Sequence, residues 1–147
     1  MSELSVSIKR LDSSVELPSY AYEGDAGLDL RANADVVIEP YQRVLIPTGL
    51  AIAIPDGYAG FVQPRSGMAL KQGLSIANTP GLIDAHYRGE LKVIAVNLDS
   101  EKALHIERGE RIAQLVIQQV PVVHLVEVDE LDETDRGCGG FGSSGSK

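Results

Sequence analysis

An arginine, a serine and a glycine follow one another where a short helix is predicted to begin. The segment Pro64-Arg-Ser-Gly67 precedes Met68-Ala-Leu-Lys71, which are good helix formers. Free N–H groups at a helix N-terminus attract anions, and Arg65 and Ser66 add side-chain donors there. The segment therefore predicts a phosphate-binding site, with an ordinary turn and an N-cap at Ser66 as the alternative.

One acidic residue stands between two leucines in Ala26-Gly-Leu-Asp-Leu30. In a strand, Leu28 and Leu30 face the core and Asp29 points away from it. A carboxylate placed in this way indicates either a metal-site residue, acting directly or through water, or a solvated surface residue.

A glycine-rich segment, Arg136-Gly-Cys-Gly-Gly-Phe-Gly-Ser-Ser-Gly145, carries one cation and one ring. Its glycines match the spacing of dinucleotide-binding and phosphate loops, but the required helix and the Lys-Ser/Thr pair are missing. The composition is typical of a disordered terminus. Arg136 is a bidentate phosphate donor and Phe141 a stacking ring, which favours an arm that orders when it closes over a nucleotide.

The segment Asn78-Thr-Pro-Gly-Leu-Ile-Asp-Ala-His-Tyr-Arg-Gly89 predicts a strand between two tight turns. Pro80-Gly81 suits the centre of a type II turn. Asp84 and Tyr87 would then lie on a rigid hairpin, although each by itself also fits an ordinary surface position. We expect His86 to be exposed, because no other histidine or cysteine has metal-ligand spacing with it.

Short apolar runs separated by Gly and Pro must position these residues. Strands are predicted at residues 4–11, 36–38, 43–54, 58–62, 91–98, 112–120 and 122–128. One short helix is expected at residues 66–72, with Gly73 ending it. This pattern predicts an all-β sandwich or barrel, of which the jelly roll is one solution. A change of composition near Asp132 predicts a body, residues 1–131, and an arm, residues 132–147.

Composition and charge exclude several classes of function. The chain has 147 residues, which fits one domain, and a net charge of −8. This charge predicts no binding along a nucleic acid backbone, whereas a single small anion needs only a few local donors. No apolar run could span a membrane, no signal peptide is evident, and Cys138 has no partner for a disulfide. The cytoplasm is the expected location.

Together and in this order, these segments resemble the five motifs of the trimeric deoxyuridine triphosphatase (dUTPase) family. The matching segments are Ala26-Gly-Leu-Asp-Leu30, Pro64-Arg-Ser-Gly67, Gly81-Leu-Ile-Asp84 with Tyr87-Arg-Gly89, Gly109-Glu-Arg-Ile-Ala-Gln114, and Arg136 to Gly145. They extend over nearly the whole chain, and five motifs in order are far more specific than any one of them.

The resemblance implies a jelly-roll-like β-clip subunit with one short helix and a flexible C-terminal arm. It implies a homotrimer whose active sites are shared, with the arm of one subunit covering a site built by the others. The implied reaction converts dUTP to dUMP and pyrophosphate with the help of Mg²⁺. Such a reaction keeps uracil out of DNA and supplies dUMP for thymidylate synthesis.

The resemblance also implies a role for each matching residue in the body. Asp84 would position and deprotonate the water that attacks the α-phosphorus, and Asp29 would hold the metal through water. The phosphate chain would be held by Arg65, Ser66, Gly67 and Gln114. In the arm, Arg136 would contact the γ-phosphate, Phe141 would stack on the uracil, and phosphate oxygens would be bound by Gly142, Ser143 and Ser144.

Substrate specificity would come from the hairpin. Asn78 and the backbone of Leu82, Ile83 and Asp84 would read the uracil edge. Tyr87 would pack under the deoxyribose and leave no room for a 2′-hydroxyl. Lys92 would contact substrate at a position where the family varies. A hydrogen-bonding mismatch rejects cytosine by roughly 10⁴ to 10⁵-fold, whereas the thymine methyl must collide with rigid backbone.

Two alternatives stay open. A dCTP deaminase shares the fold, but the zinc-deaminase signature is absent and the zinc-free relatives lack this combination of hairpin and arm. A non-catalytic module that senses dUTP would have no need for a water-activating carboxylate at position 84.

Overall fold

The computed structural model describes residues 2–147, which form eleven strands, one short helix and an extended arm. The elements in chain order are β1 (Ser7–Arg10), β2 (Leu28–Arg31), β3 (Val36–Ile38), β4 (Arg43–Pro47), β5 (Leu50–Ala53), β6 (Tyr58–Pro64), α1 (Ser66–Gln72), β7 (Leu74–Ile76), β8 (Gly81–Ile83), β9 (Lys92–Asn97), β10 (Leu104–Ile106) and β11 (Arg111–Gln119). The prediction of an all-β chain with one short helix is confirmed.

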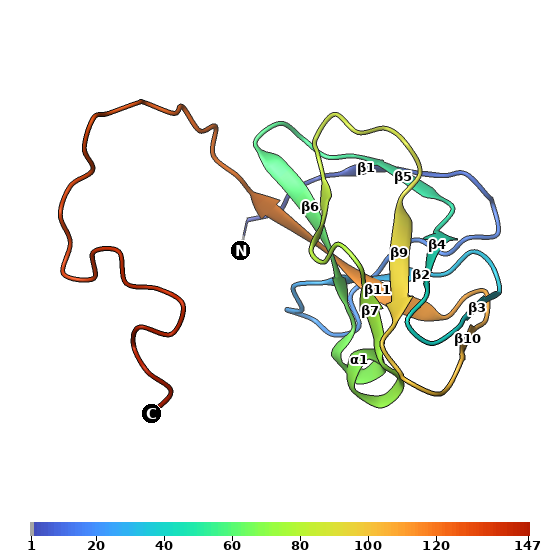
Figure 1. The fold of residues 1–147 in the computed structure, drawn as a ribbon. Coiled ribbons are helices and arrows are strands. Elements are labelled where there is room, and N and C mark those ends of the chain that lie inside the picture. Colours follow the sequence, from blue (N-terminus) through green and yellow to red (C-terminus); the bar gives the residue numbers. More distant parts are fainter. Residues whose placement is uncertain (1) are drawn as a thin grey trace.

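Strands that are distant in sequence lie side by side, and all of their pairings are antiparallel (Figure 1). One sheet has the order β2-β11-β6-β8, a second has the order β4-β9-β7, and β1-β5 and β10-β3 form two-stranded pairs. The chain crosses repeatedly between sheets, as a jelly roll requires. Strand β8 ends up at an edge of the largest sheet, a position that matters for the site.

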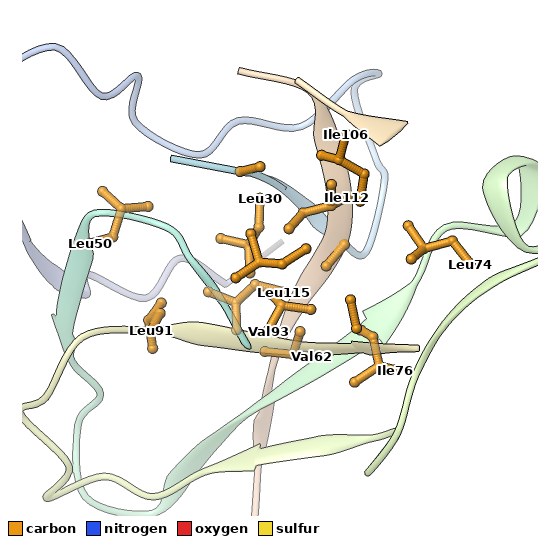
Figure 2. Packing of buried hydrophobic residues seen from close by; sticks show 14 of the residues in the cluster. Leu30, Leu50, Val62, Leu74, Ile76, Leu91, Val93, Ile106, Ile112 and Leu115 are labelled. Atoms are coloured by element: carbon orange, nitrogen blue, oxygen red, sulfur yellow. The ribbon is translucent and has the colours of Figure 1, made fainter. Parts of the chain in front are cut away.

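The core lies between the sheets and is almost entirely aliphatic (Figure 2). Along β9, Val93 and Ala95 are buried, whereas Lys92 at the start of the strand is exposed. This central strand was predicted as a buried strand. Leu30 and Ile46 have no exposed surface at all.

The predicted strand at residues 122–128 is wrong. Strand β11 ends at Gln119, and the chain then leaves the strands as an extended segment, residues 121–147, which includes the arm (Figure 1). Val122 and Leu125 are 81% and 94% exposed. An alternating sequence becomes a strand only when a neighbour accepts its backbone hydrogen bonds, and among residues 2–147 none lies beside this segment.

The N-cap of helix α1 lies one residue earlier than predicted. Arg65 is the N-cap, with no side-chain capping bond, and Ser66 is already the first helical residue, so the prediction of Ser66 as N-cap is wrong. Gly73 ends the helix in the left-handed conformation at φ 73°, as predicted. Within residues 2–147, no helix is long enough and apolar enough to span a membrane.

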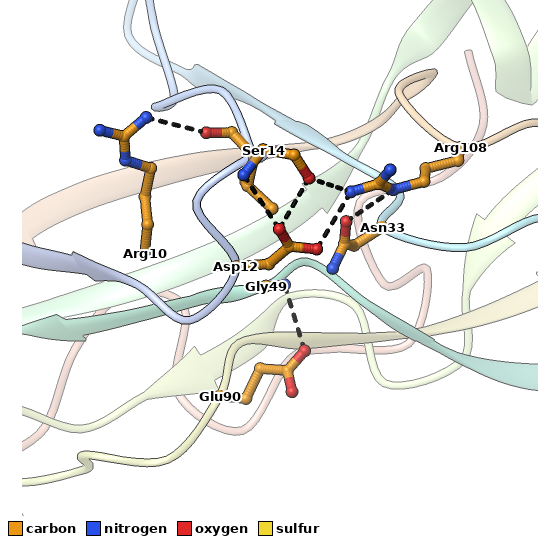
Figure 3. A network of polar contacts seen from close by, with 8 residues as sticks. Arg10, Asp12, Ser14, Asn33, Gly49, Glu90 and Arg108 are labelled. Atoms are coloured by element: carbon orange, nitrogen blue, oxygen red, sulfur yellow. Dashed lines mark hydrogen bonds and ion pairs between the residues drawn. The ribbon is translucent and has the colours of Figure 1, made fainter.

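A polar network fastens the N-terminal segment to the turn before β11 (Figure 3). The Arg108 guanidinium donates to Asp12 Oδ2 at 3.0 Å, to Asn33 Oδ1 at 3.0 Å and to the Ser14 hydroxyl. The Ser14 N–H and hydroxyl both donate to Asp12 Oδ1. This turn is therefore held from two segments that are distant in sequence.

Candidate active site

A groove of about 390 Å³ runs along β8 and the turn that follows it. Six residues with a predicted substrate role line it: Asn78, Leu82, Ile83, Asp84, Tyr87 and Lys92. Because β8 pairs only with β6, its backbone groups on the outer side take no part in the ladder of this sheet. The groove thus combines an edge of free backbone donors and acceptors with a carboxylate and an aromatic ring.

Asp84 follows the last residue of β8, and its side chain is exposed to the groove. Its backbone carbonyl accepts a hydrogen bond from the Tyr87 N–H at 3.1 Å, which closes the turn. Within residues 2–147 the Asp84 carboxylate takes part in no hydrogen bond or ion pair. All of its acceptor positions are therefore available to water or to a ligand.

The turn before β8 differs from the predicted type II turn. The Thr79–Pro80 peptide bond is cis, and Gly81 is the first residue of β8 rather than a turn residue with positive φ. The prediction of a tight turn before this strand is correct, but the predicted type II turn is wrong. The predicted hairpin is wrong as well, because β8 pairs with β6 and with neither β7 nor β9. His86 is exposed as predicted, and its Nε2 lies 2.7 Å from Asp56 Oδ1.

Arg65 and Asp29 lie in a different part of the molecule, next to a hollow of about 500 Å³. Four arginines line this hollow: Arg31, Arg65, Arg108 and Arg111. Arg65 Nε lies 3.5 Å from Asp29 Oδ1, and Arg111 Nη1 lies 3.6 Å from Asp29 Oδ2. Arg65 Nη1 also donates to the Arg111 carbonyl at 3.3 Å. These contacts hold the Arg65 guanidinium at the edge of a positively charged hollow.

One alternative from the sequence was that Asp29 is a solvated surface residue. This alternative is wrong, because the side chain is only 7% exposed. Arg65 at the N-cap of α1 and Arg111 of β11 pair with its two oxygens. Arg111 is the partner that sequence reasoning missed. It lies inside a matched motif, but spacing alone gave no sign that it would contact Asp29 across the sheet.

Ser66 and Gly67 open helix α1 directly after Arg65, and both are exposed. A Cβ built on Gly67 would meet no atom within 4 Å. The first turn of α1 therefore presents its N–H groups to open space beside Arg65. Those N–H groups have no intrahelical acceptor.

Gln114 is half-buried in β11, directly opposite Asp29 of β2 and Gln63 of β6. Side chains at directly opposite positions project from the same face of a sheet. A Cβ on Gly27 would lie 3.1 Å from the Gln114 Cβ, so glycine at position 27 makes room for this side chain. Gln114 thus shares a row with Asp29.

The arm carries the remaining predicted residues and lies away from both places (Figure 1). Arg136 Nε donates to the Gly139 carbonyl at 2.8 Å, within the arm. Phe141 is fully exposed and has a positive φ of 50°. Gly142, Ser143 and Ser144 follow in two turns, closed by Ser143 N–H to Gly140 O and Gly145 N–H to Gly142 O.

Asp29 is the predicted metal-site residue, and its surroundings limit how it could act. Among residues 2–147 there is no group of three or more His, Cys, Asp or Glu side chains that could hold a metal. Mg²⁺ commonly keeps several waters and uses one or two carboxylates together with substrate phosphates. A carboxylate has about four acceptor positions, and two arginine contacts leave room for a water. The residues therefore fit a metal that is contacted through water.

The predicted site thus falls into three places within one chain. The groove holds β8 and Asp84, the arginine-lined hollow lies beside Arg65, and the arm holds Arg136 and Phe141. No residue lines both the groove and the hollow.

Comparison with known proteins gives a consistent family. A family model described as dUTPase matches residues 13–145. The deoxyuridine 5′-triphosphate nucleotidohydrolase of Corynebacterium glutamicum is 56% identical over 140 residues, which cover 95% of this chain and 94% of that protein. The enzyme of the same name from Rhodococcus erythropolis is 56% identical over 126 residues, which cover 84% and 77%.

Solved structures agree with the sequence relatives. The Staphylococcus bacteriophage 80alpha dUTPase in complex with dUPNHPP superimposes with a TM-score of 0.88 at 34% identity, covering 97% of this chain and 99% of the phage protein. A mutant dUTPase from phage phi11 of S. aureus, described with a coordinated structural Mg(II) ion, gives a TM-score of 0.81 at 28% identity, covering 88% and 100%.

Proposed function

The chain belongs to the dUTPase family and is a dUTP diphosphatase, and we propose that Asp84 activates the water of this hydrolysis. The observation that carries the proposal is the groove, which places a carboxylate without protein partners beside an open sheet edge and a tyrosine ring. Asp84 would accept a proton from the water as it attacks the α-phosphorus, and pyrophosphate would leave. General-base catalysis of this kind contributes roughly 10² to 10⁴-fold.

The groove would also select the nucleoside. Asn78 and the free backbone edge at Leu82 and Ile83 supply donors and acceptors for the uracil, in keeping with an edge strand that pairs on one side only. Tyr87 would lie under the deoxyribose and exclude a 2′-hydroxyl. Lys92, exposed at the rim of the same groove, would reach the substrate from β9.

The triphosphate would be bound by Arg65, Ser66, Gly67 and Gln114. The support is local: Arg65 lies in a positively charged hollow, and the first turn of α1 beside it presents unpaired N–H groups. Gln114 lies directly opposite Asp29, and the Arg65 side chain contacts Asp29.

We propose that Mg²⁺ accompanies the triphosphate and that Asp29 contacts it through water. The fit rests on a single buried carboxylate with acceptor positions left over after two arginine contacts. When bound, the ion would offset negative charge on the phosphate oxygens. Arg65 and Arg111 hold the Asp29 carboxylate in one orientation for that role.

The arm would complete the site in a homotrimer. Because the groove, the hollow and the arm lie apart in one chain, we propose that each site combines parts of different copies. Arg136 would reach the γ-phosphate and Phe141 would cover the uracil, and phosphate oxygens would be bound by Gly142, Ser143 and Ser144. The same proposal treats residues 1–131 as the catalytic body and 132–147 as the arm, in a cytoplasmic enzyme.

Replacement of Asp84 by Asn tests the central step. We expect retained dUTP binding and a turnover lowered by roughly 10² to 10⁴-fold, measured as pyrophosphate release across the four standard dNTPs and dUTP. The matched control is Glu101→Gln, which neutralises an exposed carboxylate outside the groove and should leave the rate unchanged. Unchanged turnover in Asp84→Asn would remove Asp84 from this role, and ammonia release from dCTP would support the deaminase alternative.

A further inference from the structure

The turn between β8 and β9 holds Tyr87 in a defined position. Its side chain is 47% exposed and lines the groove, so part of the ring is open to a ligand. A half-exposed ring on a turn has no surrounding core to fix it. The contacts on its covered side must therefore decide where it lies.

The first of these contacts is with Gly89, whose lack of a side chain leaves space for the ring. A Cβ built at this position would lie 2.6 Å from Tyr87 Cζ and 2.9 Å from Tyr87 Cε1, closer than real Cβ atoms approach other atoms. The backbone of Gly89 does not have a positive φ, so its dihedral angles would suit other residues. Glycine is thus required here for the space that the Tyr87 ring occupies.

Glu90 supplies the second contact. The Tyr87 hydroxyl donates to the Glu90 carbonyl at 2.9 Å. The Glu90 carboxylate in turn accepts a hydrogen bond from the Gly49 N–H at 3.1 Å, in the turn between β4 and β5 (Figure 3). The end of the ring is therefore tied to a residue that is itself anchored elsewhere.

The next residue strengthens this anchor. The Leu91 N–H donates to Leu50 O at 2.8 Å, and the Leu91 carbonyl accepts from the Thr48 N–H at 3.2 Å and from the Thr48 hydroxyl at 2.6 Å. Thr48 and Leu91 are both buried. The carbonyl that receives the Tyr87 hydroxyl thus adjoins a fixed point of the core.

We infer that Gly89 and Glu90 are positioning residues for Tyr87, and that they set how strictly the enzyme excludes ribonucleotides. The inference rests on the proposed place of Tyr87 under the deoxyribose. Gly89 leaves space for the Tyr87 ring to pack against the backbone of the turn, and the Glu90 carbonyl binds the Tyr87 hydroxyl. A ring that moved would open space for a 2′-hydroxyl, and a displacement near 1 Å at an active site can cost about 10²-fold.

Selectivity, the ratio of kcat/KM for dUTP to kcat/KM for UTP, is the quantity to measure. We expect Gly89→Ala to lower this ratio at least tenfold, because the new methyl displaces the ring. In a Tyr87→Ala background the same change should lower it no further, since the ring is already gone. Gly24→Ala is the control: it adds a methyl at a glycine where a Cβ would meet no atom within 4 Å, and it should leave the ratio unchanged.

A second pair of variants does not depend on a steric change. Glu90→Gln keeps an acceptor for the Gly49 N–H and should retain most of the selectivity, whereas Glu90→Ala removes the acceptor. We expect Glu90→Ala and Tyr87→Phe to lower the ratio by similar amounts, about 2 to 10-fold, the effect of one hydrogen bond. Circular dichroism and the melting temperature of each variant establish that it is folded.

The outcomes separate this inference from the proposed function. An unchanged ratio in Tyr87→Ala would overturn the role of Tyr87 itself, and with it the basis of the inference. A lowered ratio in Tyr87→Ala together with unchanged ratios in Gly89→Ala and Glu90→Ala would overturn the positioning role alone. Equal losses in Glu90→Gln and Glu90→Ala would also contradict it.

Discussion

The groove along β8 and the C-terminal arm carry parts of one proposed site, yet they are organised in opposite ways. In the groove, the Tyr87 hydroxyl, the Tyr87 N–H and the Glu90 carboxylate are all hydrogen-bonded within the body. In the arm, Arg136 bonds only to the arm itself and Phe141 is fully exposed. The groove is thus held in place by the body, whereas the arm would acquire contacts to the body only through the proposed closure.

The difference suggests a division of roles, in which the groove selects the substrate and the arm completes the site for hydrolysis. A rigid edge can reject a wrong base or sugar because its groups cannot move to accommodate one. An arm without contacts to the body loses little when it opens, so it permits substrate entry and product release. Changes in the core should therefore affect folding, changes around Tyr87 should affect selectivity, and changes in the arm should lower dUTP hydrolysis without affecting folding.

Removal of the arm is the strongest way to test this comparison. A chain that ends at Asp135 should lose about 10³-fold or more in dUTP turnover, because an arginine that offsets charge in phosphoryl transfer contributes on that scale. Its melting temperature should be unchanged, since residues 136–147 contact no part of the body. Light scattering should show the same oligomer as the full chain. Full activity in the truncated chain would contradict the role of the arm.

Leu30→Ala tests the body. Leu30 has no exposed surface, and truncation of such a leucine costs about 2–5 kcal/mol of unfolding free energy. Urea denaturation measures this loss, and the dUTP/UTP selectivity of the protein that remains folded should be normal. A loss below about 0.5 kcal/mol would show that the core is not packed as in Figure 2.

Phe141→Ala is the counterpart in the arm. Loss of one base-stacking ring costs about 1–3 kcal/mol, or 5 to 150-fold, in kcat/KM for dUTP. The unfolding free energy should stay the same, because Phe141 touches nothing in the body. Phe141→Tyr keeps a stacking ring and should stay close to the parent. Equal activity in all three proteins would remove the uracil contact from Phe141.

The smallest expected effect concerns pH and the network around Asp12. The Ser14 hydroxyl and N–H, followed by Arg108, lower the pKa of the Asp12 carboxyl from its ordinary value of 3.8. A lowered folded-state pKa means that Asp12 stabilises the fold above pH 3.8 and that this contribution is lost as the pH falls through the folded-state pKa.

Ser14→Ala removes the strongest of these donors and should move the pKa of Asp12 up toward 3.8, as followed by an NMR titration of its carboxyl carbon. The contribution of Asp12 to stability should then be smaller, and it should be lost over a narrower pH range below 3.8. Ser13→Ala, a neighbouring change outside the network, should leave the titration unchanged. If Ser14→Ala gave the parent titration curve, the hydroxyl would not be the main cause of the shift.

Much of the fold could be predicted from apolar runs, and the wrong predictions have clear causes. Strands β9 and β11 were predicted because an apolar run bounded by turn signals indicates a buried strand, whereas β7 and β10 have only three residues each and were not predicted. The run at 122–128 alternates but forms no strand, because alternation does not supply a neighbouring strand.

The sequence by itself determined which residue types are present, their order, and the family that this order indicates. It also determined the tight turn before β8, because Pro80 restricts the backbone locally. Only the tertiary structure decided that Asp29 is buried between Arg65 and Arg111, and that Gly89 leaves room for a ring two residues away. The physical reason is that local sequence limits dihedral angles, whereas contacts across a sheet and around a turn depend on how the whole chain is packed.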